Sequence, residues 1–139
     1  MICSVNPYTN EIIEEFQSFD SILIKNTIDA CFNTFLKWKI TSLSHRINTV
    51  ISLRNILIKN KNKAATMITI EIGKPIKESN AEIDKCIWLC DYFIENAPHF
   101  LKNKKIDIGS QKSFIKYDPI GIVLGIMPWN FPFWQVFRY

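Results

Sequence analysis

Apolar residues recur every three or four positions over most of the first hundred residues, which is the spacing of helices with one apolar face. This period predicts four helices. They run from Asp20 or Ser21 to about Trp38, from Ser42 or Ser44 to about Ile58, from Lys63 to Ile72, and from about Pro75 to Lys102. Aspartate and serine are preferred at helix starts, because their side chains accept hydrogen bonds from free backbone N–H groups.

The apolar stripes of these helices predict the faces that are buried in a core. They comprise Ile24, Ile28, Cys31, Phe32, Phe35 and Trp38 in the first helix, Leu43, Ile47, Val50, Ile51, Leu57 and Ile58 in the second, and Ile83, Ile87, Cys90, Ile94 and Leu101 in the fourth.

Three segments interrupt the helical pattern. The polar stretch 60–62 predicts a break between the second and third helices. At Gly73-Lys74-Pro75, glycine suits the left-handed residue that ends a helix, and proline suits the first turn of the next. Pro98 cannot donate a hydrogen bond to the carbonyl of Ile94, so we expect it to bend the fourth helix or loosen its last turns.

Other parts of the chain have the composition of strands and turns. Turn-forming residues between Asn6 and Glu11 predict a turn with a short strand on either side. Alternation over 105–108 and 112–117 predicts a β-hairpin with Gly109-Ser110 at its turn. The apolar run 120–127, ended by Pro128, predicts a strand that is buried on both faces, as in parallel sheets.

Helices that precede such a strand indicate an α/β fold. Only one strand of this kind is present, so we expect an incomplete domain. An unpaired strand and uncovered helices expose apolar surface. We therefore expect the 139 residues alone to associate or remain molten, and a monomer with a sharp thermal transition would contradict this.

Composition and charge argue against several functional classes. The chain is 47% hydrophobic and 13% aromatic, which is enough to form a core. Its net charge is only +4, and the lysines are spread over the helices, so we expect no nucleic-acid binding. The first eight residues do not resemble a signal peptide, and no apolar run is long enough to cross a bilayer. We expect a cytoplasmic protein that binds no membrane.

Four cysteines are candidates for a nucleophile or a metal site. Cys86 and Cys90 are four residues apart on a helix and would need two further ligands to hold a metal. Neither His45 nor His99 lies at a recognisable ligand spacing. We predict no metal site and interpret this pair as helix packing. The other two thiols are Cys31, in the apolar stripe of the first helix, and Cys3, near the N-terminus.

The segment that carries chemistry is Pro128-Trp129-Asn130-Phe131-Pro132, after which a helix is expected. It places an amide at the carboxyl end of the predicted strand, where open α/β folds bind ligands. The Asn130 side chain offers two uncharged N–H donors, which suit an oxygen that becomes negative during a reaction. From the residues alone an alternative stands, in which Asn130 caps the next helix and the tryptophans belong to a core.

Several segments, in order along the chain, resemble the aldehyde dehydrogenase family. The stretch 121–138 resembles its strand-to-helix motif, 6–11 is similar to its Asn-Pro-Ala-Thr-Gly-Glu, and 71–75 is similar to its Glu-x-Gly-Lys-Pro. Glu82 follows as an acidic residue does there. Residues 89–93 and 134–138 are most similar to the succinate-semialdehyde dehydrogenase branch.

The resemblance implies roles for residues in the last segment. Asn130 matches the family's oxyanion residue, whose amide stabilises the thiohemiacetal formed when a cysteine attacks the aldehyde. The stretch that lies along the NAD or NADP cofactor is matched by Ile126, Met127, Pro128 and Trp129.

The same resemblance implies that Phe131 and Gln135 line the substrate tunnel. Arg138 matches the position at which semialdehyde-specific members hold the distal carboxylate of the substrate. A guanidinium can grip a carboxylate with two parallel hydrogen bonds. The alternative is that Arg138 is simply solvated.

The resemblance also implies what the chain contains and lacks. Residues 1–139 match the N-terminal part of the cofactor-binding domain, and 105–118 match a hairpin through which family members form homo-oligomers. The family's nucleophilic cysteine, general-base glutamate and Gly-x-x-x-x-Gly turn have no counterpart, so we expect the catalytic domain to be absent. Without a thiolate no covalent intermediate forms, and we expect the chain alone to be inactive. The alternative function is a non-catalytic fragment or interaction module.

Overall fold

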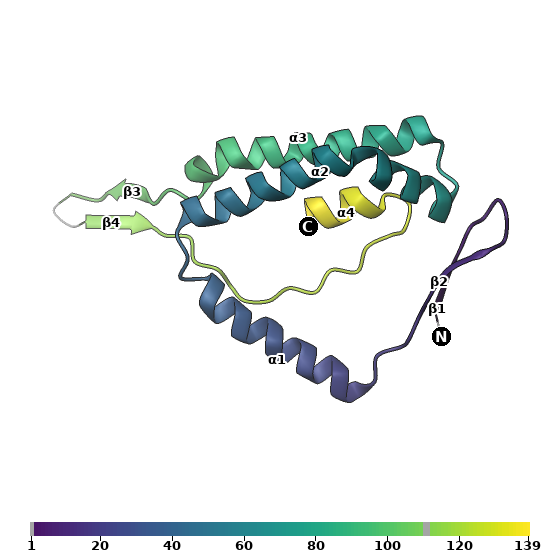
Figure 1. Cartoon of the computed structure of the whole chain (residues 1–139). Helices are drawn as coiled ribbons and strands as arrows, with labels where there is room; N and C mark the ends of the chain where they lie inside the picture. The colour runs from purple at the N-terminus through teal and green to yellow at the C-terminus, as the bar shows by residue number, and fades with distance from the viewer. Residues whose placement is uncertain (1, 110–111) are drawn as a thin grey trace.

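The computed structural model describes residues 2–109 and 112–139, in which four helices and two strand pairs are formed (Figure 1). In chain order the elements are β1 (Ile2–Val5), β2 (Ile12–Phe16), α1 (Ser21–Trp38), α2 (Leu43–Ile72), α3 (Ile76–Phe100), β3 (Lys104–Asp107), β4 (Lys112–Ile115) and α4 (Pro132–Arg138). The α/β class is confirmed, although the strands form two separate antiparallel pairs. None of the helices in the described ranges could span a membrane.

The body of the molecule is the pair of long helices α2 and α3, which lie side by side along their lengths (Figure 1). Their facing sides form a small core of Leu57, Ala65, Ile68, Ile83 and Cys86. Two ion pairs join the helices outside this core. They are Arg54–Asp91 and Lys61–Asp84, each with an N–O distance of 2.6 Å, and their partial exposure limits their contribution to stability.

The turn between α2 and α3 forms as the sequence predicts. Gly73 has a left-handed backbone, with φ of 69°, and its N–H donates to the Thr69 carbonyl at 3.0 Å. A Cβ atom on Gly73 would lie 3.1 Å from the Cγ atom of Pro7. The absence of a side chain therefore permits both the turn and the approach of the N-terminal segment.

The predicted break at 60–62 is confirmed as a kink at Asn60, at which two helical segments join within α2. Asn60 alone leaves helical geometry, with φ of −108° and ψ of 15°, and its side-chain amide donates to the Ile56 carbonyl at 2.8 Å. Beyond it, Ala65 and Ile68 are buried. Packing against α3 thus continues past a locally polar stretch, and the second and third predicted helices adjoin at the kink without an intervening loop.

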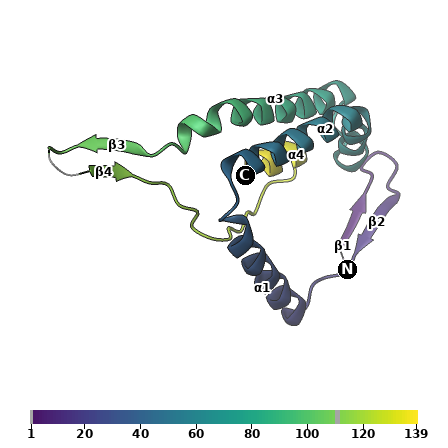
Figure 2. The same cartoon turned by 60° about the vertical axis from the view of Figure 1, so that its left-hand side comes forward.

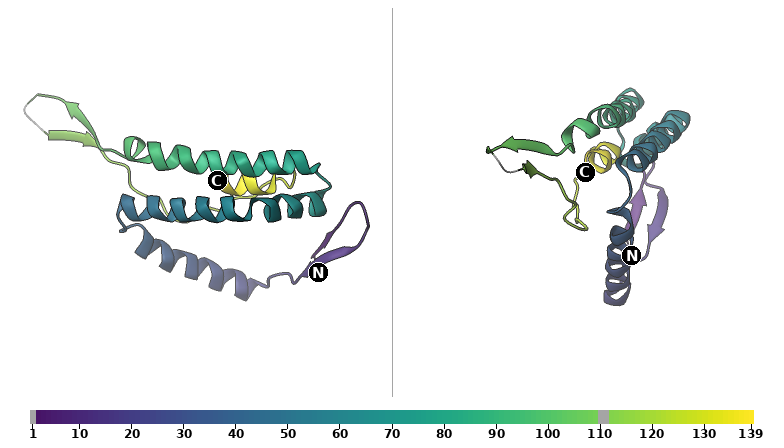
Figure 3. Two further views of the ribbon diagram at one scale, coloured as in Figure 1. Left: turned by 45° about the horizontal axis from the view of Figure 1, so that its top comes forward. Right: turned by 90° about the vertical axis from the view of Figure 1, so that its left-hand side faces the viewer.

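The helix expected after Pro132 is present as α4. It lies against both α2 and α3, as Figure 3 shows. Phe133, Trp134 and Phe137 pack on the core cluster. This contact makes α4 the third component of the helical body and fixes the position of the segment that precedes it.

The strand predicted over 120–127 is not formed, and this is the main correction to the fold. The segment is a long connection between β4 and α4 (Figure 1). Ile120, Leu124 and Ile126 are 93%, 85% and 89% exposed. No backbone hydrogen bond joins 119–127 to another described residue. A strand needs a hydrogen-bonding neighbour, and none of the described strands lies beside this segment.

Helix α1 begins where predicted, since the Asp20 carboxylate accepts a hydrogen bond from the Leu23 N–H at 2.7 Å. Its predicted burial is wrong, because α1 has no buried residue. Figure 3 shows α1 diverging from the α2–α3 pair. None of the described elements packs against α1, so its apolar stripe stays exposed. The stripe of α3 is buried at Ile83 and Cys90, whereas Leu101 is exposed.

Both predicted strand pairs are confirmed. Strands β1 and β2 pair antiparallel on either side of the turn at 6–11. Strands β3 and β4 also pair antiparallel, with Lys105 opposite Phe114 and Ile106 opposite Ser113. Ser110, half of the predicted turn, lies outside the described residues, while Gly109 has φ of 90°. The β3–β4 hairpin projects away from the helices (Figure 2).

Replacing Gly73 tests the role of the left-handed turn. We expect Gly73→Ala to lower the free energy of unfolding by about 1–2 kcal/mol, because a Cβ disfavours this backbone conformation. Gly73→Asn should lower it less, since asparagine tolerates the left-handed region while carrying the same Cβ. Urea unfolding followed by circular dichroism measures both. Equal stability of Gly73→Ala and the unmodified chain would contradict the assignment.

Candidate functional site

The carboxylate of Glu82 connects the two chemically distinctive motifs of the chain. Glu82 is only 3% exposed although it is charged. Its Oε1 atom accepts hydrogen bonds from the backbone N–H groups of Phe133 and Trp134, at 2.9 and 3.0 Å. Its Oε2 atom pairs with the Lys74 ammonium at 2.6 Å. One side chain of α3 therefore joins the Gly-Lys-Pro turn to the start of α4.

Lys74 contacts the second motif directly as well. Its Nζ atom lies 3.7 Å from the centroid of the Phe131 ring, and its side chain is 10% exposed. Lys85 makes a similar contact with the Trp134 ring at 4.1 Å. A cation is attracted to the face of an aromatic ring, so both lysines stabilise the docking of α4 on α3.

Asn130, the predicted oxyanion residue, lies in the turn immediately before α4. Its side chain is exposed and has no hydrogen-bond partner among the described residues. The N-cap residue of α4 is Phe131, which makes no side-chain cap bond. The alternative in which Asn130 caps the helix is therefore wrong, because Glu82 binds the free N–H groups instead. The Asn130 amide is left available to a ligand.

The four predicted cofactor residues lie together before Asn130 and face solvent. Ile126 and Trp129 are 89% and 74% exposed, and Met127 is 38% exposed. Pro128 is also exposed. Trp129 is thus not a core residue, whereas Trp134 packs partly buried against the core. The result is an exposed apolar strip that ends at the Asn130 amide.

The predicted substrate residues are placed differently from one another. Phe131 is 44% exposed and lies against Lys74. Gln135 is only 8% exposed, and its Oε1 atom accepts a hydrogen bond from Arg138 Nη2 at 2.7 Å. The structure brings all three residues to the start of α4, because the Gln135 N–H donates to the Phe131 carbonyl at 3.0 Å and the Gln135 side chain binds Arg138.

The sequence interpretation did not assign a site role to Glu82 or Lys74. A signal was present, however. Ser79, Glu82 and Cys86 share one face of α3, and all three are buried. Because an acidic residue is seldom buried without a partner, its occurrence on an apolar helical face indicates a specific contact.

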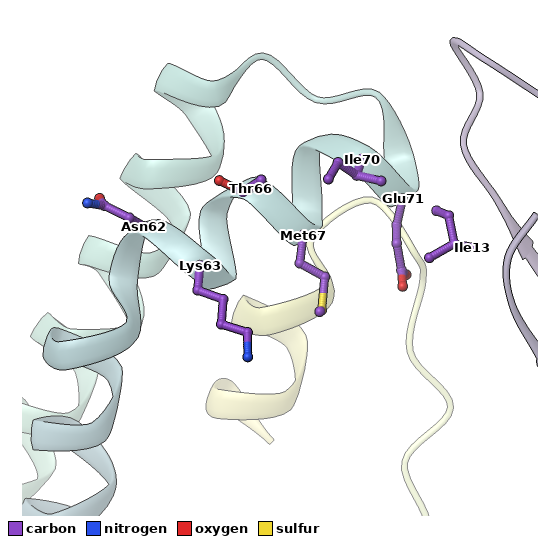
Figure 4. Close-up of a pocket in the computed structure, with 7 residues that line it drawn as sticks. All are labelled: Ile13, Asn62, Lys63, Thr66, Met67, Ile70 and Glu71. Carbon is purple, nitrogen blue, oxygen red and sulfur yellow. The ribbon is translucent and has the colours of Figure 1, made fainter. Parts of the chain in front are cut away.

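The cavities lie apart from Asn130. The one drawn in Figure 4, of about 390 Å³, is formed by the second half of α2 and by Ile13 of β2. It is lined by Ile13, Asn62, Lys63, Thr66, Met67, Ile70 and Glu71. A second cavity of about 380 Å³ lies between α2 and α4, with Phe133 and Phe137 in its wall. Neither contains a predicted site residue, and we find no cluster of three metal-ligating side chains in the described ranges.

The cysteines of α3 are packing residues, as the sequence interpretation holds. Cys86 and Cys90 are 0% and 4% exposed. Burial and, to a smaller extent, the nearby Glu82 carboxylate raise the pKa of Cys86 to about 12. Burial also raises the pKa of Cys90. Both thiols stay protonated at neutral pH, which disfavours either as a nucleophile.

Comparison with known proteins shows the family to which the chain belongs. The model of the aldehyde dehydrogenase family matches residues 1–138. The chain therefore belongs to the aldehyde dehydrogenase family.

Two individual relatives that the chain resembles are succinate-semialdehyde dehydrogenases. The chain is 36% identical over 135 residues to a succinate semialdehyde dehydrogenase [NAD(P)+] of Escherichia coli, covering 97% of this chain and 29% of that protein. It is 31% identical over 138 residues to a probable succinate-semialdehyde dehydrogenase [NADP(+)] of Synechocystis, covering 99% of this chain and 30% of that protein.

A solved structure shows the same arrangement. It is the succinic semialdehyde dehydrogenase of Streptococcus pyogenes in complex with NADP+, with a TM-score of 0.91 and 27% identity. The match covers 98% of this chain and 30% of that one. The chain thus spans about 30% of the length of the proteins it resembles.

Thiol reactivity tests the cysteine assignment. We expect a thiol reagent at pH 8 to modify the exposed Cys3 and Cys31 quickly, and Cys86 and Cys90 only after unfolding. Because the folded-state pKa of Cys86 is about 12 against an ordinary 9.0, raising the pH to 10 should not make it reactive. Peptide mass spectrometry locates the modified residues. Fast modification of Cys86 in the folded chain would contradict the assignment.

Proposed function

We propose that this chain supplies the oxyanion-stabilising amide and part of the cofactor surface of an NAD(P)-dependent aldehyde dehydrogenase that oxidises succinate semialdehyde. The observation that carries the proposal is the exposed, unpaired amide of Asn130, which directly precedes a helix anchored by a buried carboxylate. Membership of the family and the activities of the relatives supply the reaction.

The role of Asn130 follows from the chemistry of the aldehyde. When a nucleophile adds to the carbonyl, the carbonyl oxygen gains negative charge. An amide N–H that is already in place stabilises this charge without reorganisation. Burial disfavours Cys86 and Cys90 as the nucleophile, and the family resemblance assigns that role to neither Cys3 in β1 nor Cys31 in α1.

The residues from Ile126 to Trp129 suit a dinucleotide. Their apolar side chains are exposed, and the backbone groups of 126 and 127 have no partner among the described residues. They would therefore hold the cofactor through side-chain contact and backbone hydrogen bonds. When bound, NAD(P)+ supplies the hydride acceptor of the oxidation. In the presence of neighbouring strands we expect 120–127 to become a strand of a Rossmann-like sheet, because both of its faces are apolar.

Arg138 is the proposed contact for the distal carboxylate of the substrate. It uses one nitrogen to bind Gln135, which orients the guanidinium. A guanidinium has five N–H donors, so others remain for a carboxylate. Phe131 and Gln135 are the residues proposed to line the substrate tunnel.

The β3–β4 hairpin is proposed as the contact with a second copy of the chain in a homo-oligomer. It projects from the helical body and exposes Ile106, Phe114 and Ile115. Apolar side chains on a projecting hairpin are typical of surfaces covered by a partner. The free thiols at exposed positions suit a reducing compartment, and we place the protein in the cytoplasm.

A fusion tests the proposed role of Asn130. The full 139-residue chain is joined to the part of the Escherichia coli relative that lies beyond the matched stretch. We expect the fusion to reduce NAD(P)+ with succinate semialdehyde and the unfused chain to show no turnover. Asn130→Ala should lower kcat of the fusion by about 10²–10³-fold, the usual loss for one oxyanion donor.

The matched control is Asn26→Ala, which removes an exposed asparagine from the surface of α1. This variant should retain the kcat of the unmodified fusion. Retention of full kcat by Asn130→Ala would show that its amide does not stabilise the oxyanion.

A further inference from the structure

We infer that Glu82 and Lys74 are positioning residues for Asn130, because they hold the backbone and the aromatic ring that immediately follow it. This inference rests on the proposed function of Asn130. It adds two residues, 48 and 56 positions earlier in the chain, to the machinery that places the oxyanion-stabilising amide.

The start of α4 has no side-chain cap from its own residues. Phe131 occupies the N-cap position without a side-chain bond, and Pro132 has no N–H to donate. The first backbone donors that need a partner are therefore those of Phe133 and Trp134. Both donate to the same oxygen of Glu82. The cap comes from another helix and ties α4 to α3.

The negative charge of Glu82 is favourable at the start of α4 and is compensated by Lys74. A carboxylate at a helix N-terminus is favoured by the partial positive charge of the free N–H groups. A buried carboxylate is stable only if its negative charge is paired with a positive one. The Lys74 ammonium provides this pairing, with its Nζ atom 2.6 Å from Oε2 of Glu82. The Glu82 and Lys74 side chains are 1% and 10% exposed, so water screens the pair little.

Lys74 and Glu82 hold the residues that directly follow Asn130. Phe131 follows Asn130 directly, and its ring lies 3.7 Å from Lys74 Nζ. Pro132 restricts the next backbone torsion. Phe133, three residues after Asn130, is bound through its N–H to Glu82. The chain after Asn130 is therefore fixed at a side chain and at the backbone, although Asn130 itself touches neither anchor.

The experiment uses the fusion with the Escherichia coli relative. We expect Glu82→Leu to lower kcat by about 10²-fold, because an error of about 1 Å in the placement of a reacting group has an effect of this size. Glu82→Gln should lose less, since its amide oxygen still accepts from Phe133 and Trp134. Glu78→Leu makes the same change at an exposed position one turn away on α3 and should retain kcat.

A double-mutant cycle separates positioning from general stabilisation. If Glu82 acts through Asn130, Glu82→Leu should change kcat by less than about 3-fold in an Asn130→Ala background. An undiminished loss in that background would mean that Glu82 only stabilises the fold, and would overturn the inference. A large loss in Asn130→Ala with full kcat in Glu82→Leu would overturn this inference alone. Full kcat in Asn130→Ala would overturn the proposed function as well.

A second measurement keeps the inference falsifiable if a fusion variant loses activity for an unrelated reason. Hydrogen exchange of the fusion, followed by mass spectrometry, reports the amides of Phe133 and Trp134 in the peptide that contains them. Glu82→Leu should increase the exchange rate of this peptide by at least 10-fold, and Lys74→Met should increase it less. Glu78→Leu should leave it unchanged. Equal exchange in all four chains would overturn the anchor on which the inference depends.

Discussion

A single buried carboxylate holds together the parts of this chain that form its candidate site. Glu82 accepts two backbone N–H groups of α4 with one oxygen and the Lys74 ammonium with the other. An unpaired charge at 3% exposure would be strongly unfavourable. The three donors offset that cost only when α4 and the Gly73 turn are both in place. The carboxylate therefore selects the arrangement in which the two motifs meet.

The contrast between the two sides of Asn130 shows what this anchor achieves. The chain after Asn130 is bound through Phe131, Phe133 and Trp134. The chain before it, over 119–127, makes no backbone hydrogen bond to another described residue. Asn130 thus lies between the start of α4, which is anchored by Glu82, and the exposed apolar segment 119–127. Such a position suits an amide that must be fixed in space and still open to a ligand.

Local signals in the sequence predicted local structure correctly, and signals that depend on distant partners did not. Asp20 and Gly73 mark helix ends because their effects act within one turn. The polar stretch near Asn60 correctly marks the kink of α2, although the packing of Ala65 and Ile68 on α3 limits the break to one residue. The strand over 120–127 requires a neighbour that no local pattern supplies. The role proposed for Asn130 comes from its motif, whereas the contact of Glu82 with α4 exists only when α3 and α4 meet.

The Glu82 carboxylate, and not a residue of α4, caps the start of that helix. A crystal structure of the fusion with the Escherichia coli relative tests it most directly. We expect one Glu82 oxygen within about 3 Å of the backbone nitrogens of both Phe133 and Trp134, with Lys74 on the other oxygen. A structure in which water or the Asn130 side chain binds these two nitrogens, and Glu82 turns away, would contradict it.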